Sequence, residues 1–175
     1  MTSTTKTTLK FLHSIVRRCS PFPIPDLSVE DIFNYLNYSD MLSSSGQPTQ
    51  DQFTLIARAG YSVVINLATQ DKIEFPVKDE ASIVTDLGMV YIPIPVDFFN
   101  PSPSDFDRFV SAMKDVEKEK VWVHCMVNAR ASAFIYRYRL SVLGHDKEDA
   151  LWDLREIWEP FGVWKTFVYK TISGH

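Results

Sequence analysis

The chain has 175 residues, of which 45% are hydrophobic and 23% are charged. This balance is typical of a globular protein with a sizeable buried core, and it excludes a disordered chain. The formal net charge of -4 provides no chain-wide attraction to nucleic acid or to an anionic membrane, so neither is expected as a partner. No apolar stretch of the sequence approaches the roughly 20 residues that cross a bilayer, so membrane insertion is not expected.

The first 25 residues differ in composition from the rest of the chain. They contain no acidic residue, end in a Pro-rich segment, and carry the basic side chains Lys6, Lys10, Arg17 and Arg18. We interpret residues 1–25 as a basic arm and residues 26–175 as the folded domain, although organellar transit peptides have a similar composition. The two cysteines, Cys19 and Cys125, lie in different contexts and predict no disulfide framework. A reducing compartment, the cytoplasm, is therefore expected.

Strand-like and helix-like segments alternate along residues 26–175. Helices are expected near residues 28–31, 49–58, 79–87, 104–117 and 131–143, and strands near 38–43, 61–67, 90–96 and 120–124. The run at 61–67 is rich in β-branched residues without alternation, as in a strand buried on both faces. Two prolines, each without an N–H to donate, place the run at 90–96 at a sheet edge or make it partly irregular. This order predicts an α/β fold with a mostly parallel sheet of four to five strands, flanked by helices.

The segment from Cys125 to Arg130 has the residue types of an anion-binding nucleophilic loop. Cys125 ends a buried strand and a helix follows, so the helix N-terminus favours a thiolate and its N–H groups favour a bound anion. Arg130 can place its planar guanidinium over two oxygens of a phosphate-like group. Attack of Cys125 on phosphorus would give a phosphocysteine that water hydrolyses. The predicted phosphate-binding residues are Met126, Val127, Asn128, Ala129, Arg130 and Ala131, and no metal or cofactor is expected.

From about residue 34 to 164 the chain resembles a protein-tyrosine-phosphatase-like family of small proteins, some of which are fused to a metallo-β-lactamase-like hydrolase. The marks of this resemblance are Ser45-Gly-Gln-Pro48, Gly60-Tyr-Ser-Val-Val-Ile-Asn-Leu67, Tyr91-Ile-Pro-Ile-Pro-Val96 and His124-Cys-Met-Val-Asn-Ala-Arg-Ala-Ser132. The resemblance implies the cysteine-phosphatase fold, with the Cys–Arg loop at the base of the pocket. It also implies a phosphatase that acts on a phosphorylated protein or small molecule.

The loop departs from well-characterised cysteine phosphatases in two ways. It has one residue fewer between Cys125 and Arg130, and it contains no glycine. Asn128 is therefore the residue most able to adopt a positive φ. The residue after the arginine is usually Ser or Thr in those enzymes, where its hydroxyl aids departure of the thiolate. Here that position is Ala131, so Ser132 is the candidate, unless its hydroxyl bonds to the helix backbone.

The resemblance also implies a general acid, an aspartate on a loop that precedes the helix and strand leading to the cysteine. Asp97 fits this position, and a loop aspartate that only orders its turn is the alternative. Asp105 and Asp107 are competitors, but a first-turn helix acid explains Asp105 and a solvated surface explains Asp107. By the same resemblance, His124 orients the loop and tunes Cys125.

Two other functions remain open from the sequence. Rhodanese-like sulfurtransferases use a cysteine loop of this shorter length to hold a persulfide, although their loops generally contain glycine. A catalytically weak, phosphate-binding pseudophosphatase would use the same loop without turnover. The sequence leaves the oligomeric state open. Aromatic residues near the C-terminus have near-helical spacing, which predicts that they pack terminal helices into the core: Trp152, Trp158, Phe161, Trp164, Phe167 and Tyr169.

Overall fold

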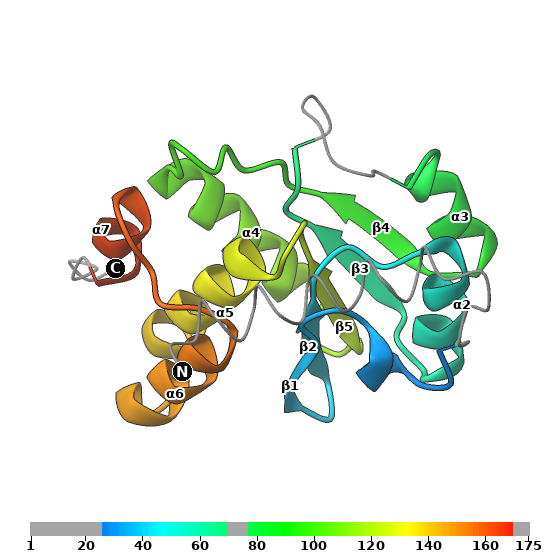
Figure 1. Ribbon diagram of the computed structural model, residues 1–175, viewed down its shortest axis with the longest axis horizontal. Coiled ribbons are helices and arrows are strands. Elements are labelled where there is room, and N and C mark those ends of the chain that lie inside the picture. The colour runs from blue at the N-terminus through cyan, green and yellow to red at the C-terminus, as the bar shows by residue number, and fades with distance from the viewer. Residues whose placement is uncertain (1–25, 70–76, 170–175) are drawn as a thin grey trace, which may run out of the picture.

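The computed structural model describes residues 26–69 and 77–169, so the predicted basic arm lies outside the described residues (Figure 1). In chain order the elements are η1 (Val29–Asp31, a 3-10 helix), β1 (Leu36–Ser39), β2 (Leu42–Ser45), α2 (Gln50–Arg58), β3 (Val63–Asn66), α3 (Glu80–Asp86), β4 (Val90–Pro93), α4 (Pro103–Asp115), β5 (Val121–His124), α5 (Ala129–Ser141), α6 (Lys147–Ile157) and α7 (Val163–Tyr169). Among these helices, none is long and apolar enough to cross a membrane.

The strands form a five-stranded sheet in the order β1-β2-β5-β3-β4. Neighbouring strands from β2 to β4 are parallel, and only β1 is antiparallel to its neighbour. The predicted α/β fold with a mostly parallel sheet is therefore confirmed. The strand that contains Pro93 lies at the edge, as predicted, because proline has no N–H to donate to a second neighbour.

One strand prediction was wrong. Residues 38–43 do not form one strand, because the chain turns at Asp40 and Met41 and pairs Leu36 with Ser44 in a hairpin. The turn is two residues long and carries no glycine, so its sequence lacks the usual hairpin signal. The hairpin matters for function because β2 lies directly beside the central strand β5.

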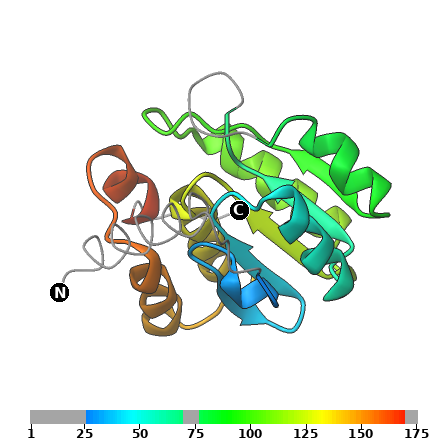
Figure 2. The same cartoon turned by 45° about the vertical axis from the view of Figure 1, so that its right-hand side comes forward.

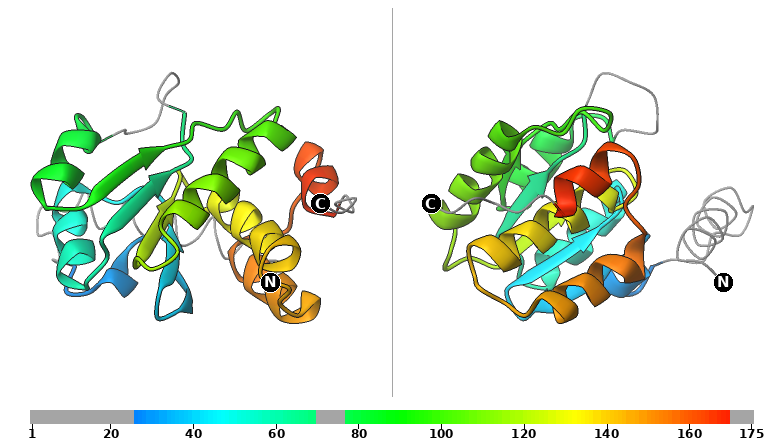
Figure 3. Two further views of the ribbon diagram at one scale, coloured as in Figure 1. Left: turned by 180° about the vertical axis from the view of Figure 1, so that it is seen from behind. Right: turned by 90° about the vertical axis from the view of Figure 1, so that its left-hand side faces the viewer.

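Helices cover both faces of the sheet and make two hydrophobic clusters (Figures 1 and 3). Helices α2 and α3 pack on one face, against Val64 and Trp122, whereas α4, α5, α6 and α7 belong to the larger cluster on the other. Successive residues of β5 alternate between the clusters, since Val121 and Val123 join the larger one. This double burial explains why β3 and β5 are apolar at every position before their last residues, Asn66 and His124.

The ends of the helices follow local sequence signals. Thr49 caps α2 by accepting a hydrogen bond from Gln52 N, and Gly60 follows the helix with φ +84°. Helix α5 begins at Ala129, two residues before the predicted start, because Asn128 takes the left-handed conformation and turns the chain directly into the helix.

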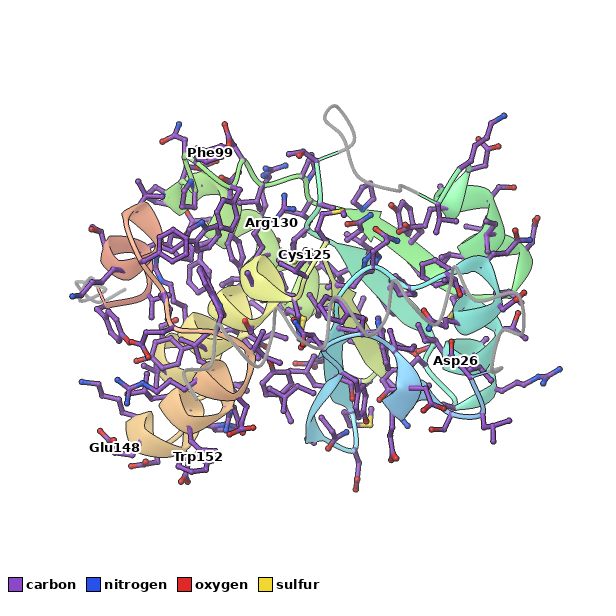
Figure 4. All side chains as sticks on the ribbon, viewed as in Figure 1. Asp26, Phe99, Cys125, Arg130, Glu148 and Trp152 are labelled. Carbon is purple, nitrogen blue, oxygen red and sulfur yellow. The ribbon has the colours of Figure 1, made fainter. Side chains whose placement is uncertain are left out.

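The prediction for the C-terminal aromatic residues was only partly correct. Trp158, Trp164 and Phe167 are buried in the larger cluster, as predicted. Trp152 is 70% exposed and Phe161 is 63% exposed. Helix α6 lies beside β1 (Figure 2), and Trp152 projects from its outer face (Figure 4).

Candidate active site

Cys125 directly follows β5, the central strand of the sheet. The carboxyl ends of β3, β4 and β5 lie on the same side of the sheet because these strands are parallel (Figure 1). Ligands bind at the carboxyl ends of the strands in open α/β sheets. Figure 4 shows Cys125 and Arg130 next to each other where β5 leads into α5. The Cys125 side chain is 0% exposed and forms no disulfide.

The carbonyl oxygens of the loop after Cys125 are bonded to neighbouring segments. Met126 O accepts a hydrogen bond from Gln47 N at 3.0 Å. Val127 O accepts one from Asn34 Nδ2 at 2.9 Å. Because these oxygens are held by other parts of the chain, they are turned away from any anion that the loop binds.

Ser132 closes the first turn of α5. Its backbone N–H donates to Asn128 O at 3.0 Å, and this is the first hydrogen bond of the helix. The N–H groups of residues 129–131 therefore precede the helical ladder and can bind an anion. The Ser132 hydroxyl also donates to Asn128 O, at 2.7 Å, so this side chain has the backbone-bonded arrangement that was the alternative to a catalytic role.

Asn128 takes the place of the missing glycine. Its φ is 69°, which confirms the prediction that this residue adopts the left-handed conformation. Its buried Nδ2 donates to Asn34 O at 2.7 Å and to Ser44 Oγ at 2.8 Å. A glycine would adopt the same backbone conformation without these bonds, so Asn128 both turns the loop and ties it to β2 and to Asn34, two residues before β1.

Gly46 brings β2 close to the cysteine loop. Its N–H donates to Phe33 O at 2.7 Å. A Cβ at Gly46 would lie 2.6 Å from Phe33 Cδ1 and 2.9 Å from Met126 O, closer than real Cβ atoms approach other atoms. The Ser45-Gly-Gln-Pro48 segment is thus a packing partner of the loop, a role that its turn-like sequence did not reveal.

Arg130 links the cysteine loop to the segment that contains Asp97. Its side chain is only 6% exposed, and Nη1 donates to Val96 O at 2.9 Å. Asp97 follows immediately and is exposed. Its Oδ1 accepts from Phe99 N at 2.8 Å. Asp97 therefore lies on a loop held to Arg130, and its side chain also orders the turn that follows.

The Asp97 loop is anchored by the C-terminal aromatic residues. The Phe98 ring lies 5.5 Å from the Trp164 ring and 6.2 Å from the Trp158 ring, between centroids. Trp164 Nε1 donates to Phe98 O at 2.7 Å. Phe99, at the outer end of this loop, is 82% exposed (Figure 4). The buried aromatic residues of the C-terminal region thus position a loop of the candidate site.

The competing aspartates are used elsewhere. Asp105 Oδ2 accepts from Ser102 N at 2.9 Å in a capping box, and Oδ1 pairs with Arg108 at 2.6 Å. Partial burial opposes ionisation of Asp105, but Arg108 and Ser102 outweigh it and lower its pKa. Asp107 is exposed on α4. Both match the helix and surface roles that the sequence suggested.

His124 belongs to a buried polar network that sequence reasoning missed. Its Nε2 lies 2.9 Å from Glu80 Oε1, which also accepts from Asn66 Nδ2 at 2.9 Å. Glu80 Oε2 accepts from Gln47 Nε2 at 2.6 Å. Gln47 and Asn66 lie within the segments that mark the family resemblance, and this was the sequence signal from which the network could have been found. Glu80 looked like any first-turn helix acid.

The charge of Glu80 follows from these contacts. Burial raises the pKa of Glu80, but neighbouring His124 and the hydrogen bonds from His124, Gln47 and Tyr91 outweigh burial and bring it below the ordinary value. An ionised carboxylate only accepts hydrogen bonds, so the His124 Nε2 must carry a hydrogen. Within the described ranges, no group of three or more His, Cys, Asp or Glu side chains is arranged to hold a metal.

A cysteine between the central strand and a helix N-terminus, with an arginine in the first helical turn, is the arrangement expected of the cysteine-phosphatase class of α/β proteins. Residues 27–157 match the family model described as DSP-PTPase phosphatase fused to NAD+ kinase. The chain belongs to this family, which confirms the predicted resemblance. In that description, the fusion partner of the phosphatase is an NAD+ kinase.

Solved structures agree with this assignment. A phosphatase candidate of the DUF442 family from Shewanella putrefaciens CN-32 is 34% identical, with TM-score 0.72, over 80% of this chain and 91% of that one. TpbA of P. aeruginosa, solved in complex with pTyr, is 18% identical with TM-score 0.58, covering 78% and 79%. The PP-IP phosphatase SIW14 of S. cerevisiae is 14% identical with TM-score 0.65, covering 79% and 85%. The last two show the fold alone. No curated protein sequence matches the chain.

Proposed function

We propose that the protein is a cysteine-dependent phosphatase that hydrolyses phosphomonoesters through a phosphocysteine. The observation that carries the proposal is the junction of β5 and α5, where Cys125, the N–H groups of residues 129–131 and the Arg130 side chain lie together. Membership of a phosphatase family favours phosphate over sulfur as the transferred group.

The proposed reaction has two steps. The Cys125 thiolate attacks phosphorus, the S–P bond forms, and the P–O bond breaks as Asp97 gives its proton to the leaving oxygen. Water then attacks phosphorus, Asp97 takes up a proton from that water, and the S–P bond breaks to release phosphate and the thiolate. Arg130 and the loop N–H groups stabilise the charge on the equatorial oxygens in both steps.

The hydrogen bond from Arg130 to Val96 O supports Asp97 as the acid. It joins the anion clamp to the residue directly before Asp97, so the loop that carries the acid and the group that binds phosphate are held together. The aromatic anchor at Phe98 holds the same loop from its other side.

A turnover assay with an aryl phosphate tests the proposal. We expect Cys125→Ser to abolish turnover and Cys19→Ser, the matched control, to leave it unchanged. Asp97→Asn is expected to slow turnover by about 100-fold, more for poor leaving groups than for good ones, because only poor leaving groups need the proton. Turnover that survives Cys125→Ser would contradict the mechanism.

Two further measurements separate the alternatives. Thiosulfate and cyanide, given to the same proteins, test for sulfur transfer, and Cys125-dependent thiocyanate formation would identify a rhodanese-like enzyme. The fully buried Cys125 and the short loop favour the pseudophosphatase as the second candidate. Binding of vanadate or phosphate without turnover of any phosphoester would establish that function instead.

The relatives suggest a substrate panel. A phosphotyrosine peptide follows from the TpbA complex, an inositol pyrophosphate from SIW14, and NADP from the family description, because an NAD+ kinase makes NADP. We expect the preferred substrate to have the highest kcat/KM in this panel. Its hydrolysis is expected to be lost in Cys125→Ser.

A further inference from the structure

Glu80 begins helix α3, yet its side chain is only 7% exposed. It lies between α3, the end of β3, the end of β5 and the segment after β2, where it contacts Asn66, His124 and Gln47. A buried carboxylate costs free energy unless it is well paired, and an apolar or amide side chain would pack at lower cost. Packing alone therefore does not explain why a charged side chain occupies this position.

The partners of Glu80 divide into two kinds. Gln47 and Asn66 are neutral amides that hold one carboxylate oxygen each, so they fix the orientation of the carboxylate. His124 is a titratable group that donates to the carboxylate, and the Tyr91 hydroxyl is a second titratable group that hydrogen-bonds with it. The edge of the Phe53 ring packs against His124, with 5.9 Å between centroids.

This arrangement determines the state of the His124 ring. Nε2 must be a donor because the carboxylate is acceptor-only. Nδ1 is buried and has no hydrogen-bond partner among the described residues. His124 immediately precedes Cys125, so a charge on this ring is adjacent in the chain to the nucleophile. The Tyr38 hydroxyl is a titratable group that interacts with Cys125, and Arg130 lies beside Cys125 (Figure 4).

We propose that Glu80 is a positioning residue for Cys125 that acts through His124. Its carboxylate fixes the imidazole with Nε2–H directed at α3, and it stabilises a positive charge on the ring beside the thiolate. The proposal rests on the role of Cys125 as nucleophile, but its tests require no turnover.

The first test measures thiolate formation directly. The ultraviolet absorbance of the thiolate is followed as a function of pH in proteins that all carry Cys19→Ser. The signal of Cys125 is the difference in absorbance between each of these proteins and the same protein with Cys125→Ser added. We expect Glu80→Gln to raise the midpoint of thiolate formation by about one pH unit, because a positive neighbour of the thiolate is weakened. Glu80→Asp, which keeps the charge, is expected to restore part of this shift.

The sign of the shift separates three roles for Glu80. A purely structural carboxylate would leave the midpoint unchanged, and a carboxylate acting directly on Cys125 would make the midpoint fall in Glu80→Gln, because a repelling charge is removed. Either result overturns the proposal. Asp105→Asn is the matched control, since it removes another partly buried carboxylate, paired with Arg108, and should not move the midpoint.

The second test uses the protein without any change at Glu80, so it does not depend on a variant that folds. Nitrogen NMR of the imidazole, assigned with His124→Asn, is expected to show a protonated Nε2 at neutral pH, which tests the orientation of the ring, whereas the first measurement tests its charge. An unprotonated Nε2 in the folded protein would overturn the proposal. If both tests succeed and no phosphoester is hydrolysed, the proposed phosphatase function fails while the role of Glu80 stands.

Discussion

Replacing Asn128 tests how a loop without glycine keeps its shape. In Asn128→Ala, the alanine must adopt φ 69°, which costs about 1 kcal/mol. The hydrogen bonds to Asn34 O and Ser44 Oγ are also lost, at about 1 kcal/mol each. We expect the free energy of unfolding to fall by about 3 kcal/mol in total. Asn128→Gly loses the same bonds without the backbone strain, so we expect a fall of about 2 kcal/mol.

The comparison between the two variants isolates the backbone conformation. In an ordinary helix position glycine is less stable than alanine by roughly 1 kcal/mol. At residue 128 this order should reverse, as measured by urea unfolding followed through tryptophan fluorescence. Equal stabilities, or a more stable alanine variant, would refute the assignment of positive φ as the reason for Asn128. Vanadate binding by the glycine variant, measured in parallel, reports whether the loop retains its anion site.

Three further predictions concern the surroundings of the loop. Gly46→Ala forces a Cβ to within 2.9 Å of Met126 O, so calorimetry should show weaker vanadate binding, and urea unfolding a stability loss of about 1–3 kcal/mol. Folding lowers the pKa of Glu80, so ionised Glu80 stabilises the folded state above its ordinary pKa of 4.5, and this stabilisation is lost as the pH falls through the folded-state pKa. Glu80→Gln should therefore make the free energy of unfolding depend less steeply on pH in the acid range. Trp164→Phe removes the bond to Phe98 O, which should cost about 1 kcal/mol in urea unfolding and lower kcat more than it raises KM.

In the proposed mechanism, the site has two layers with different functions. The layer that would face substrate consists of Cys125, Arg130 and the helix N-terminus, and it is formed by residues close together in the chain. The layer behind it, with Glu80, is formed by residues from several strands and helices. In that mechanism, variation in the second layer would tune the nucleophile without changing the groups that bind phosphate.

The features that the sequence determined by itself are local ones. The apolar run that became β3 predicted a strand buried on both faces, and the two prolines after Val90 predicted the sheet edge. The order Cys125, short loop, helix predicted an anion site, and the absence of glycine singled out Asn128 for positive φ. Each of these depends on steric limits or hydrogen-bonding groups of a few consecutive residues, so it can be read from the chain alone.

The tertiary structure decided which distant residues support the loop. Glu80 and His124 are 44 residues apart, and Asn34 and Asn128 are 94 residues apart. No local pattern distinguishes Glu80 from a solvated first-turn acid, because its burial arises only when α3 packs against β3 and β5. The hairpin of β1 and β2 was hidden for a related reason, since its pairing is specified by contact with β5 and not by a turn with its own signal. Contacts between segments that are far apart in the sequence therefore set the environment of Cys125.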